Sequence, residues 1–166
     1  ADAIIVETQI SLEELQIGIE AAKQAGAACI IGSMVYEATL DAPTPRTMIG
    51  VDPEHAAEFM QEHGADIVGL NCGKGMDMPH VLLAVQQYRK ACDLPVMVQP
   101  NAGQPKLVDM KVCYNETPEQ MARGVVPLLE AGTSILGACC GSTPEHILAF
   151  RREIDRFVKG TTDEQR

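Results

Sequence analysis

Tryptophan is absent from this chain of 166 residues, and phenylalanine and tyrosine occur only three times each. Long apolar runs are missing too, because none approaches the roughly 20 residues that an α-helix needs to cross a bilayer. The first residues lack the basic start and the apolar core of a secretory signal peptide. We therefore expect no membrane partner. The chain begins at Ala1 instead of Met, and we expect it to be a piece of something longer.

Basic residues are also scarce. The chain has 13 Lys and Arg against 23 Asp and Glu, which gives a formal net charge of −10. An acidic chain without a basic cluster repels phosphate backbones, so the composition argues against nucleic acid as a partner. The acidity itself says little more, because it mainly aids solubility.

Six cysteines stand in a chain that is 46% hydrophobic. By its length the chain is one domain, large enough to bury a core. Such a chain does not need a disulfide scaffold, and in a reducing compartment its cysteines are more often metal ligands, catalysts or core residues. We therefore expect a cytoplasmic protein.

Five short apolar runs alternate with helical patterns. Each run is nearly continuous and rich in Ile and Val, as expected for strands that are buried on both faces. The expected strands are Asp2–Val6, Ala28–Met34, Asp66–Leu70, Pro95–Gln99 and Ser134–Ala138. The helices between them have clear capping and terminating residues. They are expected to begin near Ser11, Asp52, Pro79, Thr117 and Thr143 and to end near Gly26, Gly64, Ala91, Gly132 and Gly160.

One βα unit recurs roughly every 30 to 40 residues, which predicts an α/β fold with a parallel sheet. Five units suit either an open doubly wound sheet or the last five units of a closed eight-stranded barrel. The two longer connections, Tyr36–Val51 and Asn101–Glu116, follow strands. They are therefore expected at the carboxyl ends of the sheet, where parallel folds place their active sites.

Three thiols are expected at this same edge. Cys72 follows the third strand, and Cys139 and Cys140 follow the fifth. Three thiolates suit a zinc ion that keeps its fourth position open for a substrate. A strained vicinal disulfide, a nucleophilic thiol beside a spectator, and three core thiols remain alternatives.

Three more polar side chains end strands at this edge. Glu7 follows Ile-Ile-Val, where a buried carboxylate needs a cationic partner such as the ammonium group of a substrate or an internal Lys or Arg. Asn71 and Asn101 are candidates for fixing substrate groups or bracing the ligands, and turn formation is the alternative. The histidines are expected to have surface or packing roles, including His146 close to the cysteine pair.

Four motifs occur in order: Glu7-Thr8 after a strand, Gly69-Leu-Asn-Cys72, Pro100-Asn-Ala-Gly103, and the run from Gly137 to Ile147 around Cys-Cys-Gly. The set resembles the homocysteine S-methyltransferase family, which includes the homocysteine-binding domain of cobalamin-dependent methionine synthase and betaine–homocysteine methyltransferase. The family usually has Gly-Gly-Cys-Cys-Gly-Thr, and here Ala138 and Ser142 depart from that pattern.

The resemblance implies a (β/α)8 TIM barrel of which this chain supplies about five βα units. Residues 1–160 would be the C-terminal portion of the homocysteine-binding barrel domain, and 161–166 a polar tail. The N-terminal half of the barrel would then be a missing partner. The piece by itself would fold poorly, pair with a partner or be inactive, and a split or inactive half-barrel subunit is one alternative function.

The resemblance also implies the site. Cys72, Cys139 and Cys140 would be the Zn²⁺ ligands, and Glu7, Asn71 and Asn101 would bind or support homocysteine. The zinc-bound thiolate would accept a methyl group to form methionine. We expect a cobalamin on a corrinoid protein or domain as the donor, with betaine- or S-methylmethionine-type donors as alternatives. A metal-dependent lyase or hydrolase that uses Glu7 on a carboxylate-rich site is a competing hypothesis, although few Asp or Glu residues lie at this edge.

Overall fold

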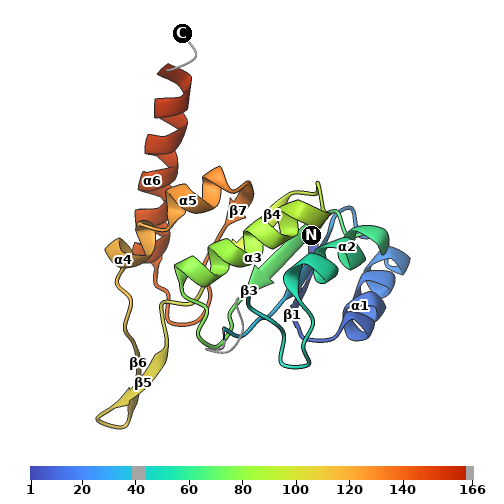
Figure 1. The fold of residues 1–166 in the computed structure, drawn as a ribbon, viewed down its shortest axis with the longest axis horizontal. Coiled ribbons are helices and arrows are strands. Elements are labelled where there is room, and N and C mark those ends of the chain that lie inside the picture. Colours follow the sequence, from blue (N-terminus) through green and yellow to red (C-terminus); the bar gives the residue numbers. More distant parts are fainter. Residues whose placement is uncertain (39–43, 164–166) are drawn as a thin grey trace.

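The computed structural model describes residues 1–38 and 44–163. Helices and strands alternate along most of the chain (Figure 1). The elements are, in chain order, β1 (Ile4–Gln9), α1 (Leu12–Gln24), β2 (Ile30–Met34), α2 (Pro53–Glu62), β3 (Ile67–Asn71), α3 (Met78–Ala91), β4 (Val96–Gln99), β5 (Pro105–Val108), β6 (Lys111–Tyr114), α4 (Pro118–Ala122), α5 (Val125–Glu130), β7 (Thr133–Leu136) and α6 (Pro144–Asp163).

The main sheet has five strands in the order β1-β2-β3-β4-β7, and every neighbouring pair is parallel. Strand order follows chain order, so each strand is laid beside the one before it. This confirms the α/β fold class with a parallel sheet. It also brings the carboxyl ends of β3, β4 and β7 to one edge.

Local capping explains where the helices begin. The Ser11 side chain accepts a hydrogen bond from the backbone of Glu14 at the start of α1. Asp52 and Asp77 cap α2 and α3 in the same way. Thr117 caps α4 with a full capping box. Each cap satisfies a backbone N–H that the helix itself leaves without a partner.

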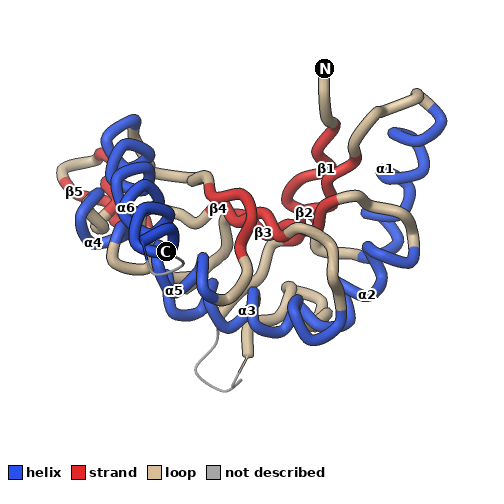
Figure 2. The backbone as a smooth tube through the Cα atoms, turned by 90° about the horizontal axis from the view of Figure 1, so that it is seen from above, coloured by secondary structure: helices blue, strands red, loops and turns tan. Residues whose placement is uncertain are grey.

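Helices α1, α2, α3 and α5 cover one side of the curved sheet (Figure 2). The core lies between the two layers, where Val68, Leu70 and Val98 of the central strands are buried with Leu15 and Met60 of the helices. Alternate strand residues point to the other side of the sheet because the side-chain period of a strand is two. In the described residues, no helix is both long and apolar enough to cross a membrane.

The expectation that all five strands are buried on both faces is wrong for the outer two. All residues of β2 are buried. In contrast, β1 and β7 form the edges, where Ile4, Ile5 and Ile135 are 42%, 39% and 40% exposed. Sheet edges with exposed apolar side chains are a known liability for a folded chain.

Three further boundaries differ from the sequence expectation. Strand β1 continues to Gln9, so Glu7 lies inside a strand and not after one. The connection over residues 101–116 contains the antiparallel hairpin β5–β6. The helix expected over 117–132 is divided into α4 and α5 near Gly124.

The helix α6 runs past the expected end near Gly160 to Asp163. Residues 164–166 of the expected polar tail lie outside the described residues, as do residues 39–43 of the connection after β2.

Candidate metal centre

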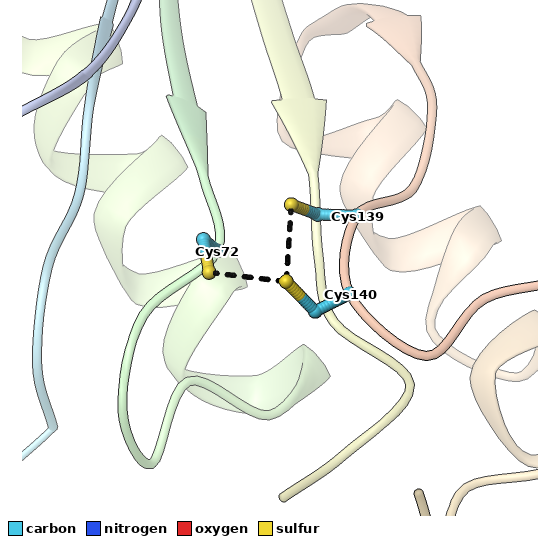
Figure 3. Close-up of side chains that lie close together, drawn as sticks. All are labelled: Cys72, Cys139 and Cys140. Carbon is cyan, nitrogen blue, oxygen red and sulfur yellow. Dashed lines mark hydrogen bonds between the residues drawn. The ribbon is translucent and has the colours of Figure 1, made fainter. Parts of the chain in front are cut away.

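Cys72, Cys139 and Cys140 lie together at the carboxyl edge of the sheet (Figure 3). The Cys140 sulfur is 3.8 Å from the Cys72 sulfur and 3.8 Å from the Cys139 sulfur. All three sulfurs lie within 4.8 Å of one another. In the parts of the chain that the structure describes, they form the only cluster of three potential metal-ligating groups.

The last residue of β4 and the residue directly after it fix both segments that carry the thiols. The Cys72 amide donates to the Gln99 carbonyl at 3.0 Å, and the Cys139 amide donates to the Pro100 carbonyl at 2.8 Å. Cys72 itself has a left-handed backbone with φ of 57°. This conformation is uncommon for a residue with a side chain and is enriched at functional sites.

Asn101 joins the two thiol-bearing segments. Its side-chain oxygen accepts from the Cys140 amide at 3.1 Å, and its side-chain nitrogen donates to the Gly73 carbonyl at 3.2 Å. The side chain is buried, with the residue only 6% exposed. The Cys140 carbonyl in turn accepts from the Ala102 amide at 2.9 Å. The Asn101 carboxamide is thus engaged in holding the cluster together.

Asn71 ties three neighbouring strands together directly before Cys72. Its side-chain oxygen accepts from the Ser33 hydroxyl at 2.8 Å and from the Thr8 amide at 3.1 Å. Its side-chain nitrogen donates to the Thr8 hydroxyl at 2.8 Å. The sequence pattern indicated Asn71, and it included Thr8 in a motif without giving it a role. It missed Ser33 and both contacts to Asn71, since these depend on strand pairing.

Two of the alternatives for the thiols are not supported. A disulfide bond has sulfurs about 2.05 Å apart, whereas Cys139 and Cys140 are 3.8 Å apart, and all six cysteines are free. The three thiols are not core residues, because Cys140 is exposed and Cys72 and Cys139 are half-buried.

The thiol spacing fits a zinc ion. A tetrahedral zinc with Zn–S bonds of about 2.3 Å requires its sulfur ligands to lie about 3.8 Å apart. Partial burial, and then the negative charge of Cys72, raise the pKa of Cys139 to about 11. Neighbouring thiolates therefore repel one another in this site, and a divalent cation between them removes that cost.

Two other expected residues lie as follows. Glu7 is exposed on β1, so the premise of a buried carboxylate is wrong: β1 is an edge strand here. Glu7 nevertheless precedes Thr8, which is hydrogen-bonded to Asn71.

His146 is buried, with Nδ1 accepting from the Thr143 amide at 3.1 Å and Nε2 donating to the Glu116 carbonyl at 3.0 Å. It has a packing role, as expected.

Sequence reasoning missed Tyr114, which ends β6 within an expected loop. Partial desolvation raises the pKa of its phenol, with further contributions from the neighbouring thiols of Cys140, Cys72 and Cys139. The signal available in the sequence was weak, because it is a single tyrosine in a connection that follows the carboxyl end of an expected strand.

Comparison with known proteins gives three relevant likenesses. The model of the family described as homocysteine S-methyltransferase matches residues 1–154. Methionine synthase from Mycobacterium leprae (strain TN) is 29% identical over 163 residues, which cover 97% of this chain and 13% of that protein. Methionine synthase from Mycobacterium tuberculosis (strain ATCC 25618 / H37Rv) is 31% identical over 149 residues, which cover 89% and 12%.

Among known structures, the apo form of the homocysteine methyltransferase MmuM from Escherichia coli superposes with a TM-score of 0.69. The identity is 21%, and the match covers 92% of this chain and 49% of that one. At this identity the likeness concerns the fold alone. It is consistent with a partial barrel, because five βα units match about half of the other chain.

Proposed function

This chain belongs to the homocysteine S-methyltransferase family, and we propose that it takes part in methylating the thiol of homocysteine to form methionine. The observation that carries the proposal is the cluster of Cys72, Cys139 and Cys140, whose sulfurs lie within 4.8 Å of one another. We propose that these three thiols bind Zn²⁺. The chain spans only 12–13% of the length of the methionine synthases that it matches, so the remaining parts of the activity would depend on other segments.

A zinc ion held by three protein ligands lowers the pKa of a thiol bound at its fourth position, so that the thiol is a thiolate at neutral pH. A free thiol has a pKa near 8.5 and is mostly protonated at neutral pH. In the overall reaction the homocysteine thiol loses its proton, an S–CH₃ bond forms, and the bond between the methyl group and its donor breaks. The three cysteines need only hold the ion, so no protein nucleophile is required.

The other residues at this edge would position the amino acid and the ligands. We propose that Glu7 contacts the ammonium group of homocysteine, since its exposed carboxylate lies on the strand that Asn71 ties to β3. Asn71 and Asn101 use their carboxamides on neighbouring protein groups. We therefore assign them support of the substrate site through the cysteine segments.

The proposed methyl donor is methylcobalamin on a corrinoid domain or protein. Its support is the likeness to methionine synthases, of which this chain covers a small part. Betaine- and S-methylmethionine-type donors are the competing choices. Adding each donor in turn to the full-length protein with homocysteine, and measuring methionine, distinguishes them. Methionine formed only with betaine or S-methylmethionine would contradict the corrinoid proposal.

The proposed partner for the exposed sheet edges is the other half of a barrel. Ile4 and Ile5 on β1 and Ile135 on β7 are each at least 39% exposed, and the matched structure is about twice as long as this chain. Further βα units packed on these edges would cover the apolar side chains and close the barrel.

Zinc content tests the central proposal. We expect about one zinc per chain in the wild type with reductant present, because three thiolates and an open position form one site. Cys139→Ser should lose the zinc and homocysteine methylation together. Cys113→Ser is the matched control, since Cys113 is exposed on β6 and outside the cluster. A folded wild type without zinc, or a Cys72→Ser variant with full activity, would contradict the proposal.

A further inference from the structure

Gln99 lies on the strand between the two segments that carry the thiols. It is the last residue of β4. Its backbone carbonyl accepts from the Cys72 amide at 3.0 Å, and the carbonyl of the next residue, Pro100, accepts from the Cys139 amide at 2.8 Å. Gln99 therefore borders the thiol cluster from the strand that separates its two halves.

The side chain of Gln99 points away from the helices. Val96 and Val98 of the same strand pack in the core between the sheet and the helices, and alternate residues of a strand point to opposite faces. Gln99 is therefore on the face of the sheet opposite α1, α2, α3 and α5 (Figure 2), where it is half-buried. It pairs with Asn71 on β3, so the two side chains are neighbours on this face.

The two ends of the Gln99 carboxamide differ. Its Oε1 is buried and has no hydrogen-bonding partner among the residues that the structure describes. Its Nε2 is not buried and makes no hydrogen bond with these residues either, so both of its protons are free for a ligand. A buried acceptor without a partner calls for an explanation. A nitrogen that is held outward to bind a ligand supplies one.

Gly137 leaves room for this side chain on the side of β7. Its amide donates to the Val98 carbonyl at 2.8 Å, which holds it beside the end of β4. A Cβ added to Gly137 would lie 3.2 Å from the Gln99 Cγ and 3.9 Å from the Gln99 Nε2. The first of these distances is shorter than an ordinary contact between carbon atoms. The absence of a side chain at Gly137 therefore lets the carboxamide of Gln99 lie where it does.

The neighbouring polar side chains of this face are already engaged or can only accept. Asn71 donates its side-chain nitrogen to the Thr8 hydroxyl, and the Ser33 hydroxyl donates to Asn71. Glu7 carries a carboxylate, which accepts hydrogen bonds and donates none when it is ionised. Gln99 thus adds a free N–H donor to a face whose other groups do not offer one to an anion.

We propose that Gln99 is a substrate-binding residue, whose Nε2 donates a hydrogen bond to the carboxylate of homocysteine at the thiol cluster. This inference rests on the proposed function and adds to it the subsite for the acid group of the substrate. The cluster would take the sulfur through the ion, and Glu7 would take the ammonium group. The carboxylate can only accept, so it requires a donor. Because a hydrogen bond to a charged group is stronger than one between neutral groups, this contact favours an amino-acid thiol over a simple aminothiol.

The test compares two thiols that differ in the carboxylate alone. The full-length, zinc-loaded protein is titrated with homocysteine and with homocysteamine, which has the same thiol and ammonium groups and no carboxylate. Gln99→Met keeps the length of the side chain and removes its donor. The dissociation constant for homocysteine should therefore rise about tenfold or more, and that for homocysteamine should stay unchanged. The zinc content should also stay unchanged, because the backbone of Gln99, and not its side chain, binds the Cys72 segment.

Gln16→Met is the matched control. It makes the same substitution at a carboxamide that is bonded to Glu20 on α1, and it should leave both dissociation constants unchanged. Gln99→Glu is a second variant, whose carboxylate would repel that of homocysteine. Its affinity for homocysteine should fall below that of Gln99→Met, whereas homocysteamine, which has no negative group beyond its sulfur, should bind at least as well as in the wild type.

Two results would overturn the role of Gln99. Equal losses of affinity for both thiols in Gln99→Met would assign a structural role to the side chain, and an unchanged affinity for homocysteine would remove the contact altogether. A folded, full-length wild type that binds neither thiol would instead contradict the proposed function.

Discussion

The buried side chain of Asn101 accepts a hydrogen bond of 3.1 Å from the backbone amide of Cys140. The same side chain donates to the carbonyl of Gly73, the residue after Cys72. Asn101 therefore joins the segments that carry Cys72 and Cys140, two residues that are 68 positions apart in the sequence. The geometry of the cluster depends on a residue that contributes no sulfur to it.

Replacing Asn101 should weaken metal binding without removing a ligand. We expect Asn101→Ala to lower zinc affinity by about 10- to 100-fold, the usual effect of losing a partner that orients ligands. Competition with a chelator measures this affinity. Gln16→Ala is the control, because it removes a carboxamide whose exposed hydrogen bond lies on α1. Equal affinities for Asn101→Ala and wild type would show that the strand ends hold the thiols unaided.

Gly73 should be intolerant of any side chain. It has φ of 106°, and an added methyl group would overlap the backbone oxygen of Tyr36. Gly50→Ala is a matched control, with φ of 93° and nothing within 4 Å of the added group. Both variants carry a left-handed alanine, which costs about 1–2 kcal/mol, and Gly73→Ala adds the overlap. Denaturant unfolding should therefore rank Gly73→Ala clearly below Gly50→Ala. The opposite ranking would mean that the loop after Cys72 yields easily.

The sequence predicted the parallel sheet and the edge where the thiols meet, because both follow from local patterns. Apolar runs and caps place the strands and helices, and parallel strands bring their carboxyl ends to one edge. The family resemblance supplied the zinc assignment, which spacing alone left among alternatives. It also indicated Asn71 and Asn101, whose partners only the fold reveals.

Other features depend on non-local relationships that a linear pattern does not contain. The exposure of Ile4 and Glu7 follows from the position of β1 at the edge of the sheet. The two turn residues of the hairpin that ends at Tyr114 are Asp109 and Met110, both with positive φ. They differ from the Asn-Gly and Asp-Gly pairs by which such a turn is usually predicted. The sequence signal for this hairpin was therefore missing.

Asn71 should matter for folding more than for metal affinity. Asn71→Ala would leave the Thr8 amide, whose bond to Asn71 is partly buried, and the Ser33 hydroxyl, whose bond is buried, without their partner. Losing a buried hydrogen-bonding partner costs about 1–3 kcal/mol, and the unfolding free energy should fall by that amount. Ser33→Ala removes one bond only and should cost about 0.5–1.5 kcal/mol. Equal losses for the two variants would mean that the contacts to Thr8 contribute nothing.

Zinc binding should weaken as the pH falls, because the thiols must release protons to bind the ion. The pKa of Cys139 is raised to about 11 by partial burial and by the neighbouring charge of Cys72, so at neutral pH this thiol is protonated in the metal-free protein. For each thiol proton that zinc displaces, the apparent zinc affinity should fall about tenfold for every unit by which the pH drops below the pKa of that thiol.

In the metal-free protein, stability should change with pH in the opposite direction. The raised pKa of Cys139 contributes stability below the unfolded pKa near 9, and this contribution is lost as the pH rises through about 11. Titration calorimetry in two buffers of different ionisation enthalpy counts the released protons, with Cys139→Ser as the comparison. An affinity that does not change between about pH 6 and 8 would mean that the thiols already bind as thiolates, and that the burial and charge around Cys139 do not govern its protonation.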